Sequence, residues 1–511
     1  MVVPPNGCQP RRPRARKKAS PGKKSVAKSA TRQKPLPALK PKKGRLVKDP
    51  HEQFAAATEV LRRLIQSPQV AEAFDPRLRT NTRMIYTKGV TLWMLILQRL
   101  GNSLSLKGAV SHILNHDRDL LPDNRRVREG TLSENSSAYH QAKKNLSLES
   151  IHEFSAAACD YLGQAGPAVF GSQRVFIIDG TTITLEPTPE LKRAFPPATN
   201  QHGESVWPVA MLMVANEMQS GCALLPQIDP MYGPERSSEA EQARRIVRCL
   251  PEHSVVMADA GFGIFSVAYH TSQAGHDILF RLTKSRFKAL RKRARLLEEG
   301  PFHKSYCLTW QPSDKDRKSN PGLPADAEIE VAIHEVELEG GGFLYLVTTL
   351  EIDAASAGEL YSRRYDVEFD IRDLKVTMDA ENILARSVAM VKKELLTSVV
   401  AFNLIAQFRR QAAQLAGVEP RRLSFKGVWL SFRDHLLLKE PETLSAWQDL
   451  YASALISAGN RKHPQRSKPR SCPRQAHPRR PKSTKFMKTQ RQANGQIEDE
   501  QHDIPPPIVR K

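Results

Sequence analysis

The chain has 511 residues, of which 77 are Lys or Arg and 54 are Asp or Glu. That length holds two or three domains with a large core, which excludes a small protein held together by disulfides. Residues 1–50 carry 16 basic residues and one acid, residues 457–511 carry 14 and four, and the middle is close to neutral. Two basic, proline-rich arms favour a polyanionic partner such as nucleic acid, although merely solvated tails have the same composition. We expect both arms to be disordered.

The six cysteines show no C-x-x-C pair and no regular spacing, so we expect reduced, packed thiols. The longest strongly apolar run, Leu92–Leu97, is too short to cross a bilayer, and the N-terminus lacks the apolar segment of a secretion signal. These features predict a cytoplasmic protein with no membrane partner.

From His51 to about Gly166 apolar residues recur at helical spacing, which predicts a helical bundle. Two short elements within it, 103–114 and 133–146, could form a DNA-reading helix pair with Lys143 and Lys144 on the second. Plain packing of a bundle explains them equally well, because no turn signature decides between the two interpretations.

The pattern then changes to short, apolar, β-branched segments separated by helices. Continuously apolar strands between helices indicate a sheet covered on both faces, and hence an α/β fold. The predicted strands are 174–179, 207–215, 223–228, 254–259 and 277–282, and the predicted helices between them are about 235–249 and 264–273.

Residues 283–350 interrupt that order. A basic run, TKSRFKALRKRAR, leads to alternating segments that include at least one hairpin, so we expect a β-rich insertion. Helix resumes near Ala354 and continues to about Met378, and a long helix follows that ends on Gly417. No internal repeat is apparent.

The segment Tyr361–Lys375 sorts its charges by helical face. One face, about 60° wide at about 100° per residue, holds an acid, two bases and a phenol: Tyr361, Arg364, Glu368 and Lys375. The remaining acids fall on the opposite side: Asp366, Asp370 and Asp373. This segregation suggests a site, but a salt-bridged surface helix with an i,i+4 ion pair would give the same stripe.

Two further acids end apolar strands. Asp179 closes RVFII before Gly180, where Asp-Gly alone would commonly be a hairpin turn. Asp259 ends SVVMA and opens AGFG, where an Asp commonly caps a helix or turn. Together with Glu368 they are arranged like the metal-binding acids of a ribonuclease-H-like sheet. Three carboxylates without His or Cys suit Mg²⁺, with Mn²⁺ as a substitute, and such ions promote phosphoryl transfer.

These positions resemble the DDE transposases of the bacterial insertion-sequence-four family, whose hallmark is Tyr-x2-Arg-x3-Glu-x6-Lys. The hallmark is matched in full by Tyr361, Arg364, Glu368 and Lys375. The two aspartate motifs are matched by Asp179-Gly180-Thr181-Thr182 and Asp259-Ala260-Gly261-Phe262. The resemblance covers roughly residues 85–427, including the β-rich insertion, and leaves out both arms.

The resemblance implies cut-and-paste transposition, in which transposon ends are cleaved and joined to target DNA. It implies a homodimer on double-stranded DNA in the bacterial nucleoid. Asp179, Asp259 and Glu368 would be catalytic and bind metal, and Tyr361, Arg364 and Lys375 would hold DNA phosphates. In some relatives an insertion Trp stacks on a flipped base, and Trp310 is the candidate here; a Trp packed in the insertion core is the alternative.

The sequence thus predicts a ribonuclease-H-like α/β core with a β-rich insertion, an N-terminal helical bundle and disordered basic tails. The predicted regions are a basic arm (1–50), a helical domain with a DNA-binding role left open (51–170), the catalytic core (171–282 and 351–380), the insertion (283–350), a C-terminal helical region (381–456) and a basic tail (457–511). The alternative function is a catalytically inactive, domesticated DNA-binding protein, a repressor or architectural protein. The intact acids favour the enzyme, because a binder has no need of three acids that repel DNA.

Overall fold

The computed structural model describes residues 84–463 except 102–103, 116–117, 119–120, 165–170, 201–202, 339–340 and 437–443. All described residues belong to one compact unit, Gln53–Lys511. The predictions for the N-terminal arm, for the helical bundle before residue 84 and for the C-terminal arm after residue 463 lie outside the described residues. The start of the predicted C-terminal arm is ordered, because the last described helix, Leu444–Gly459, extends past residue 457.

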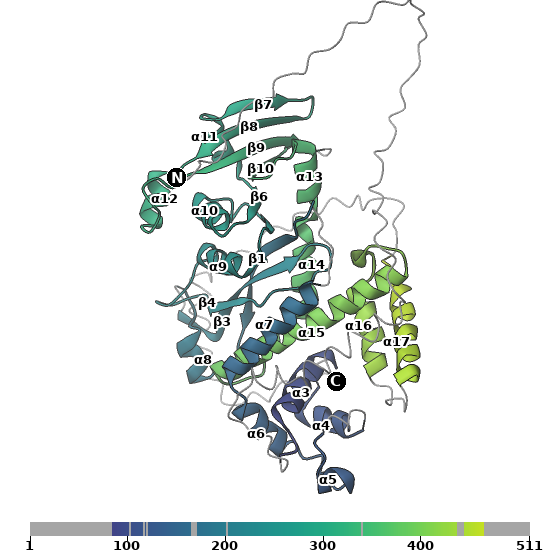
Figure 1. Ribbon diagram of the computed structural model, residues 1–511. Coiled ribbons are helices and arrows are strands. Elements are labelled where there is room, and N and C mark those ends of the chain that lie inside the picture. Colours follow the sequence, from purple (N-terminus) through teal and green to yellow (C-terminus); the bar gives the residue numbers. More distant parts are fainter. Residues whose placement is uncertain are drawn as a thin grey trace, which may run out of the picture. The chain divides into compact units, whose positions relative to one another are not determined.

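One mixed sheet of ten strands carries the described structure (Figure 1). Its strands are β1 Val175–Thr184, β2 Pro197–Asn200, β3 Gly203–Glu217, β4 Gln227–Pro230, β5 Val255–Ala258, β6 Asp277–Arg281, β7 Arg295–Glu299, β8 His303–Trp310, β9 Ile329–Glu337 and β10 Phe343–Thr348. The strand order is β2-β3-β1-β5-β6-β10-β9-β8-β7, with β4 also paired to β3. Only the pairs β1–β5 and β5–β6 are parallel among these.

The strand β1 passes straight through Asp179 and Gly180. Both residues pair with β3, opposite Val214 and Met213. The Asp-Gly pair is therefore not a hairpin turn, because β3 provides a long, continuous apolar partner on that side.

Four of the five predicted core strands are confirmed, and the strand predicted at 223–228 begins late, at Gln227. The delay has a specific cause at Ala223, which makes only an isolated bridge with Asn216. The Asn403 side chain hydrogen-bonds to both backbone groups of Ala223: it accepts from the N–H and donates to the C=O, at 2.7 Å each. These bonds replace a sheet ladder at that point.

Helices cover both faces of the sheet. On one face are α9 Glu239–Ile246 and α10 Phe265–Gln273, and on the other are α13 Ala354–Ser362 and α14 Asp366–Arg372. Side chains alternate along β1, so Phe176 and Ile178 join the first face while Val175 and Ile177 join the second.

The predicted β-rich insertion is continuous with the main sheet, because β10 pairs with β6. The expected hairpin is formed by β9 and β10. Two short helices belong to the same stretch, α11 Lys284–Arg291 and α12 Asp314–Ser319. The second lies between β8 and β9, and Ser313 and Asp316 form a capping box at its start.

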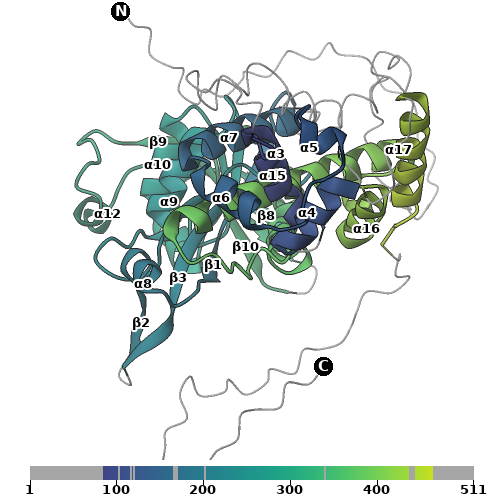
Figure 2. The ribbon, with the colours of Figure 1, turned by 90° about the horizontal axis from the view of Figure 1, so that it is seen from below.

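The remaining helices lie at the two ends of the described chain, except for the short α8 between β1 and β2. They are α3 Lys88–Leu100, α4 Leu106–Asn115, α5 Arg125–Arg128, α6 Ser137–Asn145, α7 Leu148–Gln164, α8 Pro189–Ala194, α15 Val388–Leu415, α16 Phe425–Leu436 and α17 Leu444–Gly459. Both views show α15 beside α3 and α7 (Figures 1 and 2), and these helices share one hydrophobic core with α16 and α17. The predicted regions 51–170 and 381–456 are thus packed together, and their boundaries as domains stay a prediction.

The proposed DNA-reading helix pair corresponds to α4 and α6. Lys143 is only 8% exposed, and its Nζ lies 2.9 Å from Glu394 Oε1 on α15. This lysine therefore anchors the bundle, whereas Lys144 is exposed. Within the described ranges, no helix is both long and apolar enough to span a bilayer. The described cysteines are free thiols, with Cys159 and Cys222 buried.

Candidate active site

The register of β1 and β5 brings the two predicted aspartates together. The parallel pairing sets Val175 against Val255 and Ile177 against Met257. Continued two residues beyond its last pair, this register leads to Asp179 on β1 and to Asp259, which directly follows β5, on chains about 4.8 Å apart where they pair. Both acids share the side-chain parity of Val175 and Val255, so they point to the face covered by α13 and α14.

The loop after β5 is shaped by its glycines. Asp259 Oδ1 accepts a hydrogen bond from Gly261 N at 2.8 Å, which turns the chain directly after the strand. A Cβ on Gly263 would collide with the backbone oxygen of Arg281, so any side chain there would push the loop off β6. Small residues are therefore needed to hold Asp259 at the edge of the sheet.

The third acid, Glu368, comes from the helical segment on that face. The predicted continuous helix has four parts: α13, a 3-10 turn at Arg363–Tyr365, α14, and a π turn at Asp373–Thr377. Val367 is fully buried with the β1 and β5 side chains of this face, which fixes α14 against the sheet. Glu368 follows it and is half-exposed.

Arg364 joins two of the three acids. Its guanidinium forms an ion pair with Glu368, and its Nη1 lies 3.9 Å from Asp179 Oδ2. The same guanidinium stacks over the Tyr365 ring at 4.3 Å. Arg364 is 9% exposed, so the predicted i,i+4 pair exists but also reaches into the site.

The pKa of Asp179 is raised to about 6, mainly by burial and also by the nearby Asp259 and Glu368 carboxylates, while the Gly180 N–H and Arg364 act in the opposite direction. The three acids thus repel one another. Among the described residues no three His, Cys, Asp or Glu side chains are gathered closely enough to hold a metal ion. The donor set still fits a hard divalent cation, because it consists of carboxylates with an excess of negative charge.

The two other residues of the stripe also lie around this site. Lys375 Nζ donates to Thr182 O at 2.8 Å and lies 3.4 Å from Thr181 Oγ1, both on β1 beyond Asp179. Tyr361 is 7% exposed, and its hydroxyl has no hydrogen-bond partner among the described residues. Burial raises the pKa of Tyr361, so the phenol stays protonated and able to donate.

Trp310 is packed in the insertion core and does not lie beside the three acids. It is 6% exposed, and its ring meets Phe265 of α10 edge-on, with centroids 5.7 Å apart. On β8 it shares parity with the buried Tyr306 and Leu308. This position is the packed one described as the alternative, and stacking on a flipped base stays a prediction.

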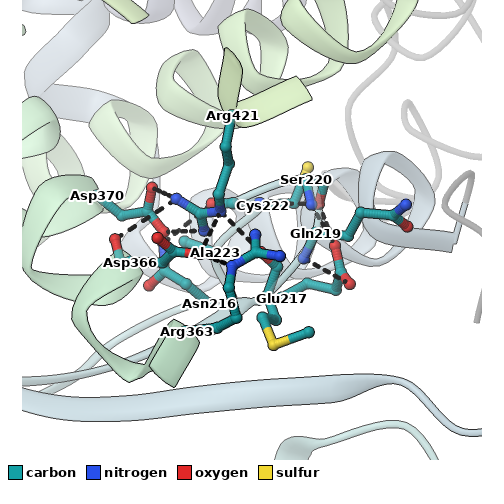
Figure 3. Close-up of polar contacts among 12 residues, drawn as sticks. Asn216, Glu217, Gln219, Ser220, Cys222, Ala223, Arg363, Asp366, Asp370 and Arg421 are labelled. Carbon is teal, nitrogen blue, oxygen red and sulfur yellow. Dashed lines mark hydrogen bonds and ion pairs between the residues drawn. The ribbon is translucent and has the colours of Figure 1, made fainter. Parts of the chain in front are cut away.

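The acids on the opposite side of α14 have a partner that sequence reasoning missed (Figure 3). Arg421 Nη1 and Nη2 donate to the two oxygens of Asp370 at 2.9 and 2.8 Å, and Arg421 Nε lies 3.2 Å from Asp366 Oδ2. We call Asp366, Asp370 and Arg421 the arginine clamp. The sequence did contain a signal for such a partner. Asp366 and Asp370 lie at i and i+4 on the face away from the stripe, and acids that become buried there need a cation.

Comparisons with known proteins agree with this geometry. A family model described as "Transposase DDE domain" matches residues 170–404. The transposase InsG for insertion sequence element IS4 of Escherichia coli (strain K12) is 24% identical over 371 residues, 70% of this chain and 80% of that protein. A piggyBac transposase synaptic complex with hairpin DNA aligns over 80% of this chain and 86% of its own, with 10% identity and a TM-score of 0.36, too low to support an argument. These two matches support an IS4-type DDE transposase, an enzyme of DNA transposition.

Proposed function

We propose that this transposase cuts DNA at the ends of an insertion sequence and joins them to target DNA, with Asp179, Asp259 and Glu368 as its catalytic acids. The observation that carries the proposal is the parallel pairing of β1 with β5, the strands that lead to Asp179 and Asp259, on the face that α14 with Glu368 covers. The three acids are far apart in the sequence, and the Asp259 and Glu368 carboxylates both raise the pKa of Asp179.

We assign five strands, in the order β4-β3-β1-β5-β6, to a ribonuclease-H-like core, with β7–β10 as its insertion. The mixed pairing supports this assignment, because an antiparallel group of strands meets a parallel group at β1. In such a sheet the carboxyl ends of parallel strands are the place for a site.

Asp179, Asp259 and Glu368 would hold a divalent cation, Mg²⁺ or Mn²⁺. When bound, the cation activates an oxygen nucleophile and stabilises the leaving oxygen of an in-line phosphoryl transfer. Glu368 must first release Arg364, so the guanidinium becomes free to hold a DNA phosphate with two hydrogen bonds. Lys375 and the Tyr361 hydroxyl supply further donors on the same side of α14.

The test is cleavage of a labelled duplex that carries the element's own ends. Asp179→Asn, Asp259→Asn and Glu368→Gln should each abolish nicking and strand transfer and leave end binding intact, and double variants should be scarcely worse, because the acids act as a unit. Mn²⁺ should replace Mg²⁺, and Ca²⁺ should permit binding with little cleavage.

The matched control is Glu359→Gln, the same change at an exposed position on α13. If Glu359→Gln is as inactive as Glu368→Gln, the assignment of the acids is wrong. Asp366 is unsuitable as a control, because its carboxylate also lies 2.7 Å from Arg363 Nε and belongs to the arginine clamp.

We propose that the partner is double-stranded DNA in the bacterial nucleoid, held by a homodimer that pairs two ends. Removal of residues 1–50 and 464–511, which leaves α17 and its buried Ala458 intact, should weaken sequence-independent binding and flatten its salt dependence, because fewer counterions are released. Cleavage of pre-bound ends should persist. An unchanged slope of log affinity against log salt would rule out this role for the arms.

A further inference from the structure

A basic surface on the folded part of the chain takes no part in the acid site. Between Arg281 and Arg295 the sequence has eight Lys or Arg residues and no Asp or Glu. Three lysines recur at i, i+4 and i+8 along α11 and its C-cap, within about 80° of arc at about 100° per residue: Lys284, Lys288 and Lys292. All three are exposed. We call them the α11 lysine stripe.

The other face of α11 is fixed to the insertion. Phe287 is 1% exposed, and its ring stacks on Tyr345 with centroids 4.5 Å apart. The Arg291 guanidinium lies 5.4 Å from the centre of the Tyr306 ring, and the Thr283 side chain caps the helix by accepting from Arg286 N. The lysine stripe is therefore held outward on a rigid element, unlike charges on a loose tail.

The stripe starts beside the acid site. Arg286 Nη1 donates to the backbone oxygen of Ala260, the residue after Asp259, at 2.5 Å. Lys284 and Arg281 line a cavity of about 440 Å³ together with Ala260 and Phe343. Positive charge thus leads from the loop that carries Asp259 along α11, away from the acids.

The positive charge of the stripe is not balanced by neighbouring acids. Glu298 and Glu299 follow the basic run, but they pair with His303 and Lys304. Among the described residues, no carboxylate forms an ion pair with a lysine of the stripe. Like charges at i,i+4 and a cation at a helix N-terminus both weaken a helix, so the fold gains nothing from this arrangement.

We propose that the α11 lysine stripe binds the sugar-phosphate backbone of the DNA duplex whose reacting phosphate lies at the acid site. The inference rests on the proposed function and extends it by naming a second contact with the same DNA. Lysines four residues apart rise about 6 Å along a helix and act as point charges, which suits a row of phosphates. Because the phosphates are the same at every base pair, such a contact is independent of sequence.

The test is the salt dependence of binding between the full-length protein and a fluorescent duplex, without divalent metal. The combined change Lys284→Gln, Lys288→Gln and Lys292→Gln should lower the slope of log affinity against log salt by about 2 to 3, close to one for each phosphate that the stripe no longer neutralises. The matched control removes three other exposed lysines with Lys315→Gln, Lys318→Gln and Lys426→Gln, and its slope should stay close to that of the wild type.

Equal changes in both variants would show that only total charge matters and would overturn the proposal, as would an unchanged slope in the α11 variant. Thermal unfolding should show the α11 variant to be as stable as the wild type or more so. If that variant fails to fold, Lys288→Gln alone should still lower the slope by about one. Binding is measured without metal and therefore without cleavage. An unchanged slope in the α11 variant would not bear on the assignment of the three acids, and the result of the cleavage test would not bear on the binding measured here.

Discussion

The two sides of α14 differ in how completely their charged side chains are paired and buried. On the side of the acid site, the Arg364 guanidinium pairs with two of the three carboxylates, and the Glu368 side chain is 50% exposed. On the other side, the arginine clamp buries Asp370 to 1% exposure and gives both of its oxygens a donor. Arg421 Nε also donates to Met218 O at 2.7 Å, which ties α14 to the end of β3.

The charges of the arginine clamp therefore stabilise the fold, whereas those of the acid site are available to bind a ligand. Glu368 lies two residues, about 200° of arc, from Asp366 and from Asp370, so a clamp on those two acids turns Glu368 toward β1. Gly221 completes the clamp side: its φ is +80°, and a Cβ there would lie 2.7 Å from Arg409 Nη2 and 3.0 Å from Asp370 Oδ1. The ion pairs of the arginine clamp thus orient Glu368 on the other side of α14.

The largest expected effect is the loss of catalysis when an acid of the acid site is changed. Glu368→Gln should lower end cleavage by on the order of 10⁴-fold, as for groups that act as a unit. The same variant should unfold at the same temperature as the wild type or a higher one, because one repelling carboxylate is gone. Cleavage and thermal unfolding measured on one preparation check this, and a marked loss of stability would show that Glu368 is structural.

The next effect is on stability and comes from the arginine clamp. Arg421→Ala should lower the free energy of unfolding by about 3 to 5 kcal/mol, because it leaves two carboxylates without their buried cation. The control is Arg363→Ala, which removes a second partner of Asp366 whose side chain is 34% exposed and should cost no more than about 1 kcal/mol. Similar urea-unfolding midpoints for the two variants would contradict the contrast drawn between the sides of α14.

A third effect concerns the pH dependence of stability. The folded pKa of Asp179 is about 6 against 3.8 for the ordinary group, so between these values the folded protein holds a proton that the unfolded chain loses. Stability from this group is present below about pH 4 and is lost as pH rises to about 6, by about 2 to 3 kcal/mol in all. Asp179→Asn should remove that loss in metal-free urea unfolding, and parallel pH curves for the two proteins would refute it.

The acid site could be predicted from the sequence because its determinants are local. An apolar strand that ends in Asp and a helix whose charges sort by face are visible without the fold, and parallel pairing then brings the acids together. Trp310 shows a signal that was present but unused. Tyr306, Leu308 and Trp310 alternate along one strand, and their shared parity indicates a core side chain.

The arginine clamp could not be predicted in the same way. Arg421 lies 51 residues from Asp370 in the sequence, and its approach depends on the direction of α15 and on the turn that follows it. The bonds of Asn403 to Ala223, over 180 residues, displaced a predicted strand for the same reason. Tertiary partners of this kind leave no periodic pattern in either segment.

The smallest expected effect on stability is that of a change at Arg364. This residue is buried like the arginine clamp, but it pairs with the carboxylates of the acid site. Its pair with Glu368 is half-exposed, so Arg364→Ala should change the free energy of unfolding by less than about 1 kcal/mol. End cleavage should nevertheless fall by about ten- to a hundredfold, because the variant lacks the guanidinium that would hold a phosphate. Arg364→Lys should restore the charge but only part of the rate, since an ammonium cannot make the two parallel hydrogen bonds of a guanidinium. A variant that melts well below the wild type and cuts normally would show that Arg364 belongs with the structural charges of the arginine clamp, and that the stripe on α14 is a salt-bridged surface.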